Sequence, residues 1–204
     1  MVIAHKISLS HKNAAINLCI LHKVKKDFTN SRNYSIIGVQ NKKTEEKTMY
    51  ITCLDLEGVL VPEIWIAFAE ASGIPELKRT TRDEPDYDKL MNWRLGVLKE
   101  HGLGLKEIQQ TIAKIDPMEG AKEFLDELRS LCQVIIISDT FTQFAAPLMK
   151  KLGMPTIFCN SLEVAENGEI TGFKMRCEKS KLTTVKALQS IGYETIASGD
   201  SFND

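Results

Sequence analysis

Short apolar runs alternate with helical patterns from Met49 onward, and this alternation restricts the fold more than any other feature of the sequence. The four runs are Met49–Leu56, Gln133–Ile137, Pro155–Cys159 and Glu194–Ser198. Runs that are apolar on both faces are typical of strands buried in a parallel sheet. Strands that alternate with helices therefore predict an α/β fold, in which a Rossmann-like parallel sheet carries helices on both faces.

Helical patterns lie between the later runs. Pro117–Leu131 has a proline in its first turn, and its apolar residues are three and four positions apart. Phe141–Leu152 has similar spacing and is followed by Gly153, a residue type that commonly ends helices. A further helix is predicted to open at Lys181.

Two segments interrupt the alternation. Glu163–Phe173 contains an Asn-Gly pair between extended arms, which predicts a β-hairpin with a type I′ turn. Between the first strand and Pro117 lie three helical stretches, at 63–72, 87–100 and 105–115. They are too many for one crossover connection and predict a small helical domain, 62–115, inserted into a core formed by 49–61 and 116–204.

Charge separates the start of the chain from the remainder. The whole sequence has a net charge of -1, which gives no electrostatic reason to expect a nucleic acid or an anionic membrane as partner. Residues 1–48 carry a net charge of +6 and residues 49–204 one of -7. Because the first segment lacks a sustained helical or strand period, we expect a basic leader or disordered extension, with organelle targeting as the less favoured alternative.

Cysteine usage and hydropathy indicate the compartment. The five cysteines are odd in number and widely spaced, with no CxxC pair, so neither a disulfide framework nor a zinc site is indicated. The apolar stretch 14–21 is closed by His22 and Lys23, and no run approaches the roughly 18 to 20 residues needed to span a bilayer. We therefore expect a cytoplasmic protein without a membrane segment.

Acidic and hydroxyl side chains follow three of the predicted strands, and a lysine begins the helix before the last strand. These residues are Asp55 and Glu57, Ser138 and Asp139, the segment 199–204, and Lys181. Because the carboxyl ends of parallel strands share one edge of a sheet, we expect them to form one site. Their oxygens suit Mg²⁺ and a phosphate group. Each residue alone is more typical of a turn, a cap or a solvated surface, so the prediction depends on the ordered combination.

In this order the motifs resemble those of the haloacid dehalogenase-like phosphohydrolases. The matching residues are Asp55-Leu56-Glu57-Gly58-Val59-Leu60, Ser138, Lys181 and Gly199-Asp200-Ser201-Phe202-Asn203-Asp204. The resemblance covers 49–204 and is greatest to the phosphoserine phosphatase group. Glu57 stands where most relatives carry aspartate, and in this it resembles bacterial members that hydrolyse phosphoserine and also transfer its phosphate to homoserine.

The resemblance implies a role for each motif residue. Asp55 would be the nucleophile that forms an aspartyl-phosphate, and Glu57 would be the general acid and base. Mg²⁺ would be bound by Asp55, the backbone carbonyl of Glu57 and Asp200, and would reduce repulsion between the nucleophile and the phosphate. The phosphate ligands would be Ser138, the backbone N–H of Asp139, Lys181 and Asn203, with Asp204 orienting the loop or the lysine.

The resemblance also implies that 62–115 is a cap over the site. Phosphoserine presents an ammonium and a carboxylate group, and Glu63 and Arg94 match the residues that bind them. The alternative partners belong to a charged, solvated loop and are Arg82, Asp83, Asp86 and Asp88. The expected ligand is a small phosphorylated amino acid, not nucleic acid or membrane, and a homodimer is compatible with this class of enzyme.

Several classes of function stay open at this level. The favoured one is a Mg²⁺-dependent phosphatase acting on L-phosphoserine, with water or homoserine as the phosphate acceptor. A receiver domain that accepts phosphate on an aspartate shares the sheet, the acids and the lysine, but lacks a helical insertion and the final motif. A non-catalytic or truncated fragment is the third class, because the chain stops at Asp204 whereas the resembled family continues, so the C-terminal part of the core is expected to be missing.

Overall fold

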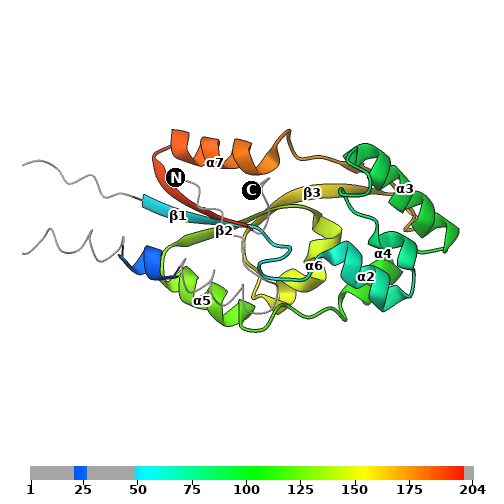
Figure 1. Cartoon of the computed structure of the whole chain (residues 1–204), viewed down its shortest axis with the longest axis horizontal. Coiled ribbons are helices and arrows are strands. Elements are labelled where there is room, and N and C mark those ends of the chain that lie inside the picture. The colour runs from blue at the N-terminus through cyan, green and yellow to red at the C-terminus, as the bar shows by residue number, and fades with distance from the viewer. Residues whose placement is uncertain (1–20, 27–48, 200–204) are drawn as a thin grey trace, which may run out of the picture.

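The computed structural model describes residues 21–26 and 49–199, and a five-stranded sheet forms its centre (Figure 1). The strands are β1 (Met49–Leu54), β2 (Gln133–Phe141), β3 (Ile157–Val164), β4 (Ile170–Lys174) and β5 (Tyr193–Ser198). Their order is β4-β3-β2-β1-β5, with β4 antiparallel to β3 and the other neighbours parallel. The predicted α/β architecture is confirmed.

The strand β1 is buried on both faces because its alternate residues enter two apolar clusters. Leu54 belongs to the larger cluster, whereas Ile51 and Cys53 belong to a second one that includes residues of β2. Successive side chains of a strand point to opposite faces, so a sheet covered on both sides needs apolar residues at every position. The register is parallel on either side of β1, since Leu54 lies opposite both Ile136 and Ser198.

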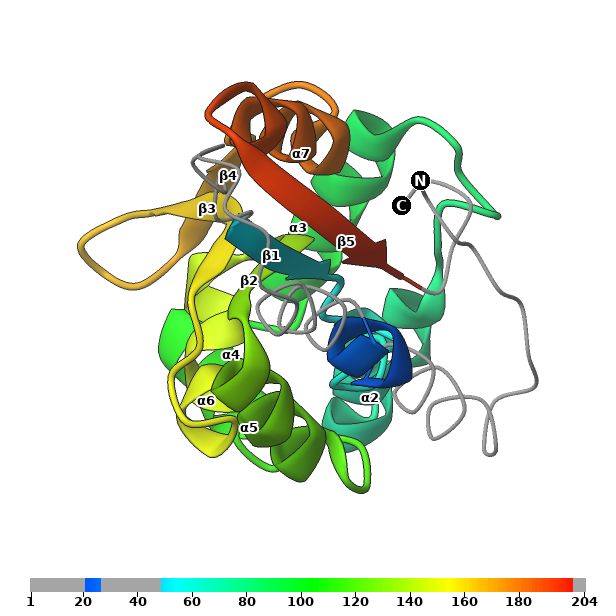
Figure 2. The same ribbon diagram turned by 90° about the vertical axis from the view of Figure 1, so that its left-hand side faces the viewer.

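Helices cover both faces of the sheet. α5 (Ala121–Leu131) and α6 (Thr142–Lys151) contact β2 from one side, and α7 (Ser180–Ser190) contacts β2 and β5 from the other. Figures 1 and 2 show α7 on the face of the sheet opposite to α5 and α6. The sheet is therefore the middle layer of three.

The first turn predicted for α5 is not helical. The helix begins at Ala121 rather than at Pro117, because Gly120 has a left-handed backbone (φ 75°). The N–H of Met118 instead donates to the carbonyl of Leu60 (2.9 Å). This contact joins the segment before α5 to the end of the loop that follows β1.

The hairpin of β3 and β4 differs from the prediction in extent. The short strand predicted at Pro155–Cys159 and the first hairpin arm are one continuous strand, β3. Its first part pairs with β2 and its second part with β4, so the hairpin extends from the sheet edge.

The turn of this hairpin is also not of the predicted type I′. That type needs a positive φ at both central residues, and Gly168 has one (φ 87°) whereas Asn167 does not. The N–H of Gly168 donates to the carbonyl of Ala165 (2.8 Å), and Asn167 Oδ1 accepts from the N–H of Glu169 (3.0 Å). This pattern is typical of a type I turn followed by a glycine bulge.

Helical elements fill the segment between β1 and α5, as predicted. They are α2 (Ile64–Ser72), the short 3-10 helix η1 (Pro75–Lys78), α3 (Tyr87–Glu100) and α4 (Leu105–Ile112). α4 contacts α2 and α6, while α3 contacts β4. Apolar residues of these helices, including Phe68 and Ile108, belong to the same buried cluster as the helices of the core.

Residues 21–26 form a short helix beside α5. Val24 is buried in the main apolar cluster, and Lys25 Nζ forms an ion pair with Glu127 (2.7 Å). The remainder of the predicted leader, 1–20 and 27–48, lies outside the described residues. Within the described part of the chain, no helix has the length and apolar character required to cross a membrane.

Candidate active site

Asp55 lies directly after β1, between the ends of β2 and β5. Its N–H donates to the carbonyl of Ser198 (2.9 Å), which extends the pairing with β5 by one residue. Its Oδ1 accepts from the N–H of Leu56 (2.7 Å), and the residue is only 9% exposed. The carboxylate is therefore held at the carboxyl edge of the sheet, where α/β enzymes bind ligands.

Lys181 and Asp55 form an ion pair across 126 positions of the sequence. Lys181 Nζ donates to Asp55 Oδ2 at 2.8 Å, and both side chains are largely buried. The lysine lies in the first turn of α7, which crosses the face of the sheet next to β5. Because a buried pair is screened less than a surface pair, the attraction between these two charges is stronger here than it would be at the surface.

Glu57 lies where its carboxyl group can exchange a proton near neutral pH. Its Oε2 accepts from the N–H of Ile64 at the start of α2 (2.9 Å). Burial raises its pKa to about 7, with a further upward contribution from Glu63, while the Ile64 N–H and the charges of Arg94 and Lys181 act to lower it. A general acid and base works best with a pKa near the working pH.

A tight loop connects the two acids to α2. The carbonyl of Leu56 accepts from the N–H groups of Leu60 (2.9 Å) and Val61 (3.1 Å). Gly58 has a positive φ of 71°, a conformation that strains a residue with a side chain, and its N–H donates to the carbonyl of Val61 (2.8 Å). The loop thus holds Glu57 close to the end of β1.

Ser138 and Asp139 lie beside Asp55 at the end of β2. The parallel register pairs Leu54 with Ile136, so Ser138 follows one residue beyond the level of Asp55. Ser138 is buried, and its Oγ accepts from the N–H of Thr140 (3.2 Å). Asp139 is exposed. The structure therefore brings together the four predicted residues Asp55, Ser138, Asp139 and Lys181 at one edge of the sheet.

Asn160 is a site residue that the sequence analysis missed. It is fully buried in β3, and its Nδ2 donates to the carbonyl of Asp139 (2.9 Å) while its Oδ1 accepts from the N–H of Arg176 (2.9 Å). The guanidinium of Arg176 in turn donates to Ser180 Oγ (2.8 Å), next to Lys181. Asn160 and Arg176 together thus connect the end of β2 to the start of α7. The signal available in the sequence was a polar residue directly after the predicted apolar strand Pro155–Cys159.

Arg94 reaches the site from α3. It is 6% exposed, and its guanidinium lies over the ring of Trp65, 4.4 Å from the centroid. Burial lowers its pKa to about 10, against the opposing charges of Tyr87, Glu57 and Glu63. Its electrostatic interaction with Glu57 and Glu63 indicates that all three lie near one another.

Glu63 and the charged loop before α3 differ in how their carboxylates are used. Glu63 is exposed at the start of α2, and its side chain does not cap the helix. In the loop, Asp83 accepts from the backbone and hydroxyl of Thr80 (2.8 and 3.1 Å), and Asp86 caps α3 by accepting from the N–H of Lys89 (3.1 Å). Two of the three alternative acids, Asp83 and Asp86, are therefore engaged in local structure, whereas Asp88 is exposed in the first turn of α3.

Three predicted site residues of the fourth motif, Asp200, Asn203 and Asp204, lie outside the described residues. Among the residues that are described, no three His, Cys, Asp or Glu side chains group closely enough to hold a metal ion. The two predicted ligands that are described, the Asp55 carboxylate and the Glu57 carbonyl, are oxygen donors at the sheet edge. Such donors fit Mg²⁺, which needs one or two carboxylates besides phosphate oxygens and water.

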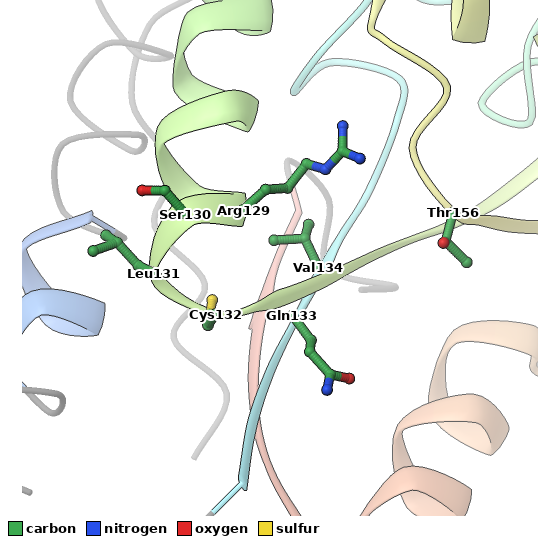
Figure 3. Close-up of a pocket in the computed structure, with 7 residues that line it drawn as sticks. All are labelled: Arg129, Ser130, Leu131, Cys132, Gln133, Val134 and Thr156. Carbon is green, nitrogen blue, oxygen red and sulfur yellow. The ribbon is translucent and has the colours of Figure 1, made fainter.

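A cavity of about 540 Å³ lies at the start of β2 (Figure 3). Its lining residues are Arg129, Ser130, Leu131, Cys132, Gln133, Val134 and Thr156. It surrounds the start of β2, whereas the acids follow the end of β1, and the two strands are parallel. Burial raises the pKa of the Cys132 thiol, which works against a thiolate nucleophile there. The catalytic candidates therefore remain those at the carboxyl edge.

The chain was compared with protein families and with individual known proteins. The family model described as haloacid dehalogenase-like hydrolase matches residues 53–204. The chain is 56% identical to a Pseudomonas aeruginosa protein named phosphoserine phosphatase ThrH, over 76% of this chain and 76% of that protein. It is 53% identical to a phosphoserine phosphatase of Pseudomonas syringae pv. tomato, over 78% of this chain and 67% of the relative.

Solved structures share the fold. A phospho-aspartyl intermediate analogue of phosphoserine phosphatase superposes with a TM-score of 0.63 at 26% identity, over 78% of this chain and 81% of the other. A substrate-bound phosphoserine phosphatase complex gives a TM-score of 0.62 at 25% identity, with the same shares of both chains.

Proposed function

The chain belongs to the haloacid dehalogenase-like hydrolase family, and from this premise we propose that it is a phosphoserine phosphatase. The observation that carries the proposal is the buried pair of Asp55 and Lys181, joined at 2.8 Å beside an acid whose pKa is about 7. An anionic nucleophile, a cation for the phosphate and a proton carrier are the groups that phosphoryl transfer through an enzyme carboxylate requires. The names of the two Pseudomonas relatives support the choice of substrate.

Asp55 is the nucleophile in this proposal. One of its oxygens attacks phosphorus while the bond from phosphorus to the serine oxygen breaks, which leaves the phosphoryl group on Asp55. The second half-reaction transfers that group to an acceptor hydroxyl and regenerates the carboxylate. Dividing the displacement in this way replaces one difficult step by two easier ones.

Glu57 carries the proton in both halves. In the first it donates a proton to the departing serine oxygen, and in the second it takes one from the acceptor. The pKa of about 7 supports both duties, because the protonated and ionised forms are then both populated near neutral pH.

Lys181, Ser138 and the N–H of Asp139 bind the phosphate oxygens, together with Asn203. An ammonium group and a hydroxyl group aimed at the phosphate stabilise the charge that spreads over its oxygens in the transition state. Asn160 holds the Asp139 carbonyl at 2.9 Å and so orients the adjoining backbone. We include Mg²⁺, held by Asp55, the Glu57 carbonyl and Asp200. When bound, the ion supplies positive charge that reduces repulsion between carboxylate and phosphate.

Substrate choice is assigned to the inserted helices. We propose that residues 62–115 form a cap over the core, which consists of 49–61 and 116–204. Arg94 binds the carboxylate of phosphoserine and Glu63 its ammonium group. The buried Arg94 Nε supports this, because it has no hydrogen-bond partner among the described residues. A buried donor without an acceptor is costly unless a ligand completes it.

Homoserine is proposed as a second acceptor besides water. It carries the same amino-acid head as serine on a chain one methylene longer, so Arg94 and Glu63 could hold it with its hydroxyl near the aspartyl-phosphate. The acid at position 57 favours this idea, since the pKa of Glu57 suits removal of a proton from an alcohol as well as from water.

We further propose that the enzyme works in the cytoplasm, which the scattered cysteines favour over an oxidising compartment.

The test is phosphate release by the full chain from L-phosphoserine and from a simple aryl phosphate, with and without Mg²⁺. We expect a strong preference for phosphoserine, and loss of turnover when the metal is removed. In Arg94→Ala, one charge-assisted contact is lost, and kcat/KM for phosphoserine should fall roughly ten- to a hundred-fold while the aryl phosphate is spared. Equal activity on both substrates in the unmodified protein would refute the assignment of phosphoserine.

A second measurement tests the acceptor. Added homoserine should divert product from inorganic phosphate to phosphohomoserine, and the diversion should collapse in Arg94→Ala. Release of inorganic phosphate that is unaffected by homoserine would limit the enzyme to hydrolysis.

A further inference from the structure

Arg94 is held by an aromatic ring. Its guanidinium carbon lies 4.4 Å from the centroid of Trp65, within the range of a cation–π contact. Among the described residues no acid forms an ion pair with it, although both Glu57 and Glu63 are near enough to influence its pKa. The ring is therefore one of the direct contacts that stabilise this buried cation.

The hydrogen bonds of Arg94 leave part of its donor capacity unused. One terminal nitrogen donates to the carbonyl of Arg79 (2.6 Å), and the other lies 3.8 Å from the sulfur of Met91, a weak acceptor. Nε is buried, and no described group accepts its hydrogen. The guanidinium is thus oriented on one side by a carbonyl and on its face by an indole.

Trp65 is itself fixed by rings from two parts of the fold. It contacts Phe144 of α6 at a centroid distance of 5.2 Å and Phe68 of α2 at 6.4 Å, both with edge-to-face geometry. Both phenylalanines are 1% exposed. Because α2 belongs to the insertion and α6 covers the sheet, Trp65 connects the inserted helices to the core at the position where Arg94 arrives from α3.

We propose that Trp65 is a positioning residue for substrate selection: its ring holds the guanidinium of Arg94 in the orientation in which it binds the carboxylate of an amino-acid phosphomonoester. The inference rests on the proposed function. It assigns to Trp65 no contact with the phosphate and no part in proton transfer. Its effect should therefore be confined to substrates that carry a carboxylate.

The chain offers a matched control. Arg79 lies over Trp93 at 5.2 Å, which is a second stack of arginine on tryptophan within the inserted helices. The side chain of Arg79 pairs with Glu84 (3.5 Å), so this cation has a carboxylate partner that Arg94 lacks among the described residues. Removing Trp93 therefore measures the loss of such a stack without removing the ring under Arg94.

The first experiment compares the full-chain enzymes Trp65→Leu, Trp65→Phe and Trp93→Leu with the unmodified protein. We expect Trp65→Leu to raise KM for L-phosphoserine roughly ten- to thirty-fold, with kcat and aryl phosphate hydrolysis changed less than about two-fold. Trp65→Phe should restore most of the affinity because it keeps an aromatic face, and Trp93→Leu should leave KM unchanged. An equal loss on both substrates, or no loss on either, would overturn the proposal.

The second experiment does not depend on activity. In ¹⁵N NMR spectra, the Nε–H signal of Arg94 should be shifted upfield by the ring current of Trp65 in the unmodified protein and in Trp93→Leu. It should move toward the ordinary arginine position in Trp65→Leu. An unchanged signal in that variant would refute the positioning role even if phosphoserine is the substrate. If the signal moves as expected but the enzyme does not prefer phosphoserine over aryl phosphate, the positioning of Arg94 stands and the proposed substrate fails.

Discussion

Replacing Glu57 by glutamine should make the stability of the metal-free protein less sensitive to pH. Burial raises the pKa of Glu57 from its ordinary value of 4.5 to about 7. A carboxyl group with a raised pKa in the folded state favours folding most when it is protonated, and this contribution is lost as the pH rises from about 4.5 through 7. Glutamine is nearly the same shape and stays neutral over this range.

The magnitude follows from the size of the shift. One pKa unit corresponds to about 1.4 kcal/mol, so the ionised Glu57 should cost the folded state about 3 kcal/mol at pH 8 relative to pH 4.5. Glu57→Gln should therefore gain roughly this amount over the unmodified protein between the two pH values. The Ile64 N–H keeps an acceptor in the variant, because the glutamine side chain retains a carbonyl oxygen.

The assay is urea unfolding in the presence of a chelator, at intervals from pH 4.5 to pH 8. The exposed glutamate Glu100 is the control, and Glu100→Gln should parallel the unmodified protein at every pH. Parallel curves for Glu57→Gln as well, or a loss of its stability at high pH, would show that Glu57 is not a buried acid with a raised pKa.

Three further predictions concern the site and its support. Asp55→Asn should reduce phosphate release by roughly a thousand-fold or more with unchanged circular dichroism, and phosphate trapped on another residue would refute the nucleophile. Asn160→Leu leaves the Arg176 N–H without its acceptor and the Asp139 carbonyl with only the longer bond from the Tyr87 hydroxyl (3.4 Å), so it should cost about 1–3 kcal/mol in urea unfolding. Val24→Ala should cost about 1–2 kcal/mol while exposed His22→Ala stays within about 0.5 kcal/mol; equal values would show that 21–26 does not pack on the core.

The sequence by itself determined the architecture, and it predicted that residues after separate strands would meet at one edge of the sheet. Strand formation in a doubly covered sheet requires a continuous apolar run, and helix packing requires apolar residues at spacings of three and four, so both leave local patterns. The acids after β1 and the serine after the apolar part of β2 were predicted to meet because parallel strands end at one edge. The structure places Asp55, Ser138 and Lys181 together there.

Local patterns were less informative about turns and element ends. The Asn-Gly pair favoured a type I′ turn, but the side chain of Asn167 bonds the N–H of Glu169, and only Gly168 adopts a positive φ. The start of α5 was placed four residues early, because the bond from Met118 to the Leu60 carbonyl comes from a distant segment. Such competing contacts are invisible in a single stretch of sequence.

Only the tertiary structure decided the chemical environment of each site residue. A glutamate acquires a pKa near 7 when the surrounding protein removes water from its carboxyl group, and that depends on residues from several elements. Likewise the stack of Arg94 on Trp65, and the bridge that Asn160 makes between Asp139 and Arg176, join residues far apart in the chain. Sequence spacing determines which side chains share a strand end or a helix face, whereas burial and long-range contacts determine their charge and orientation.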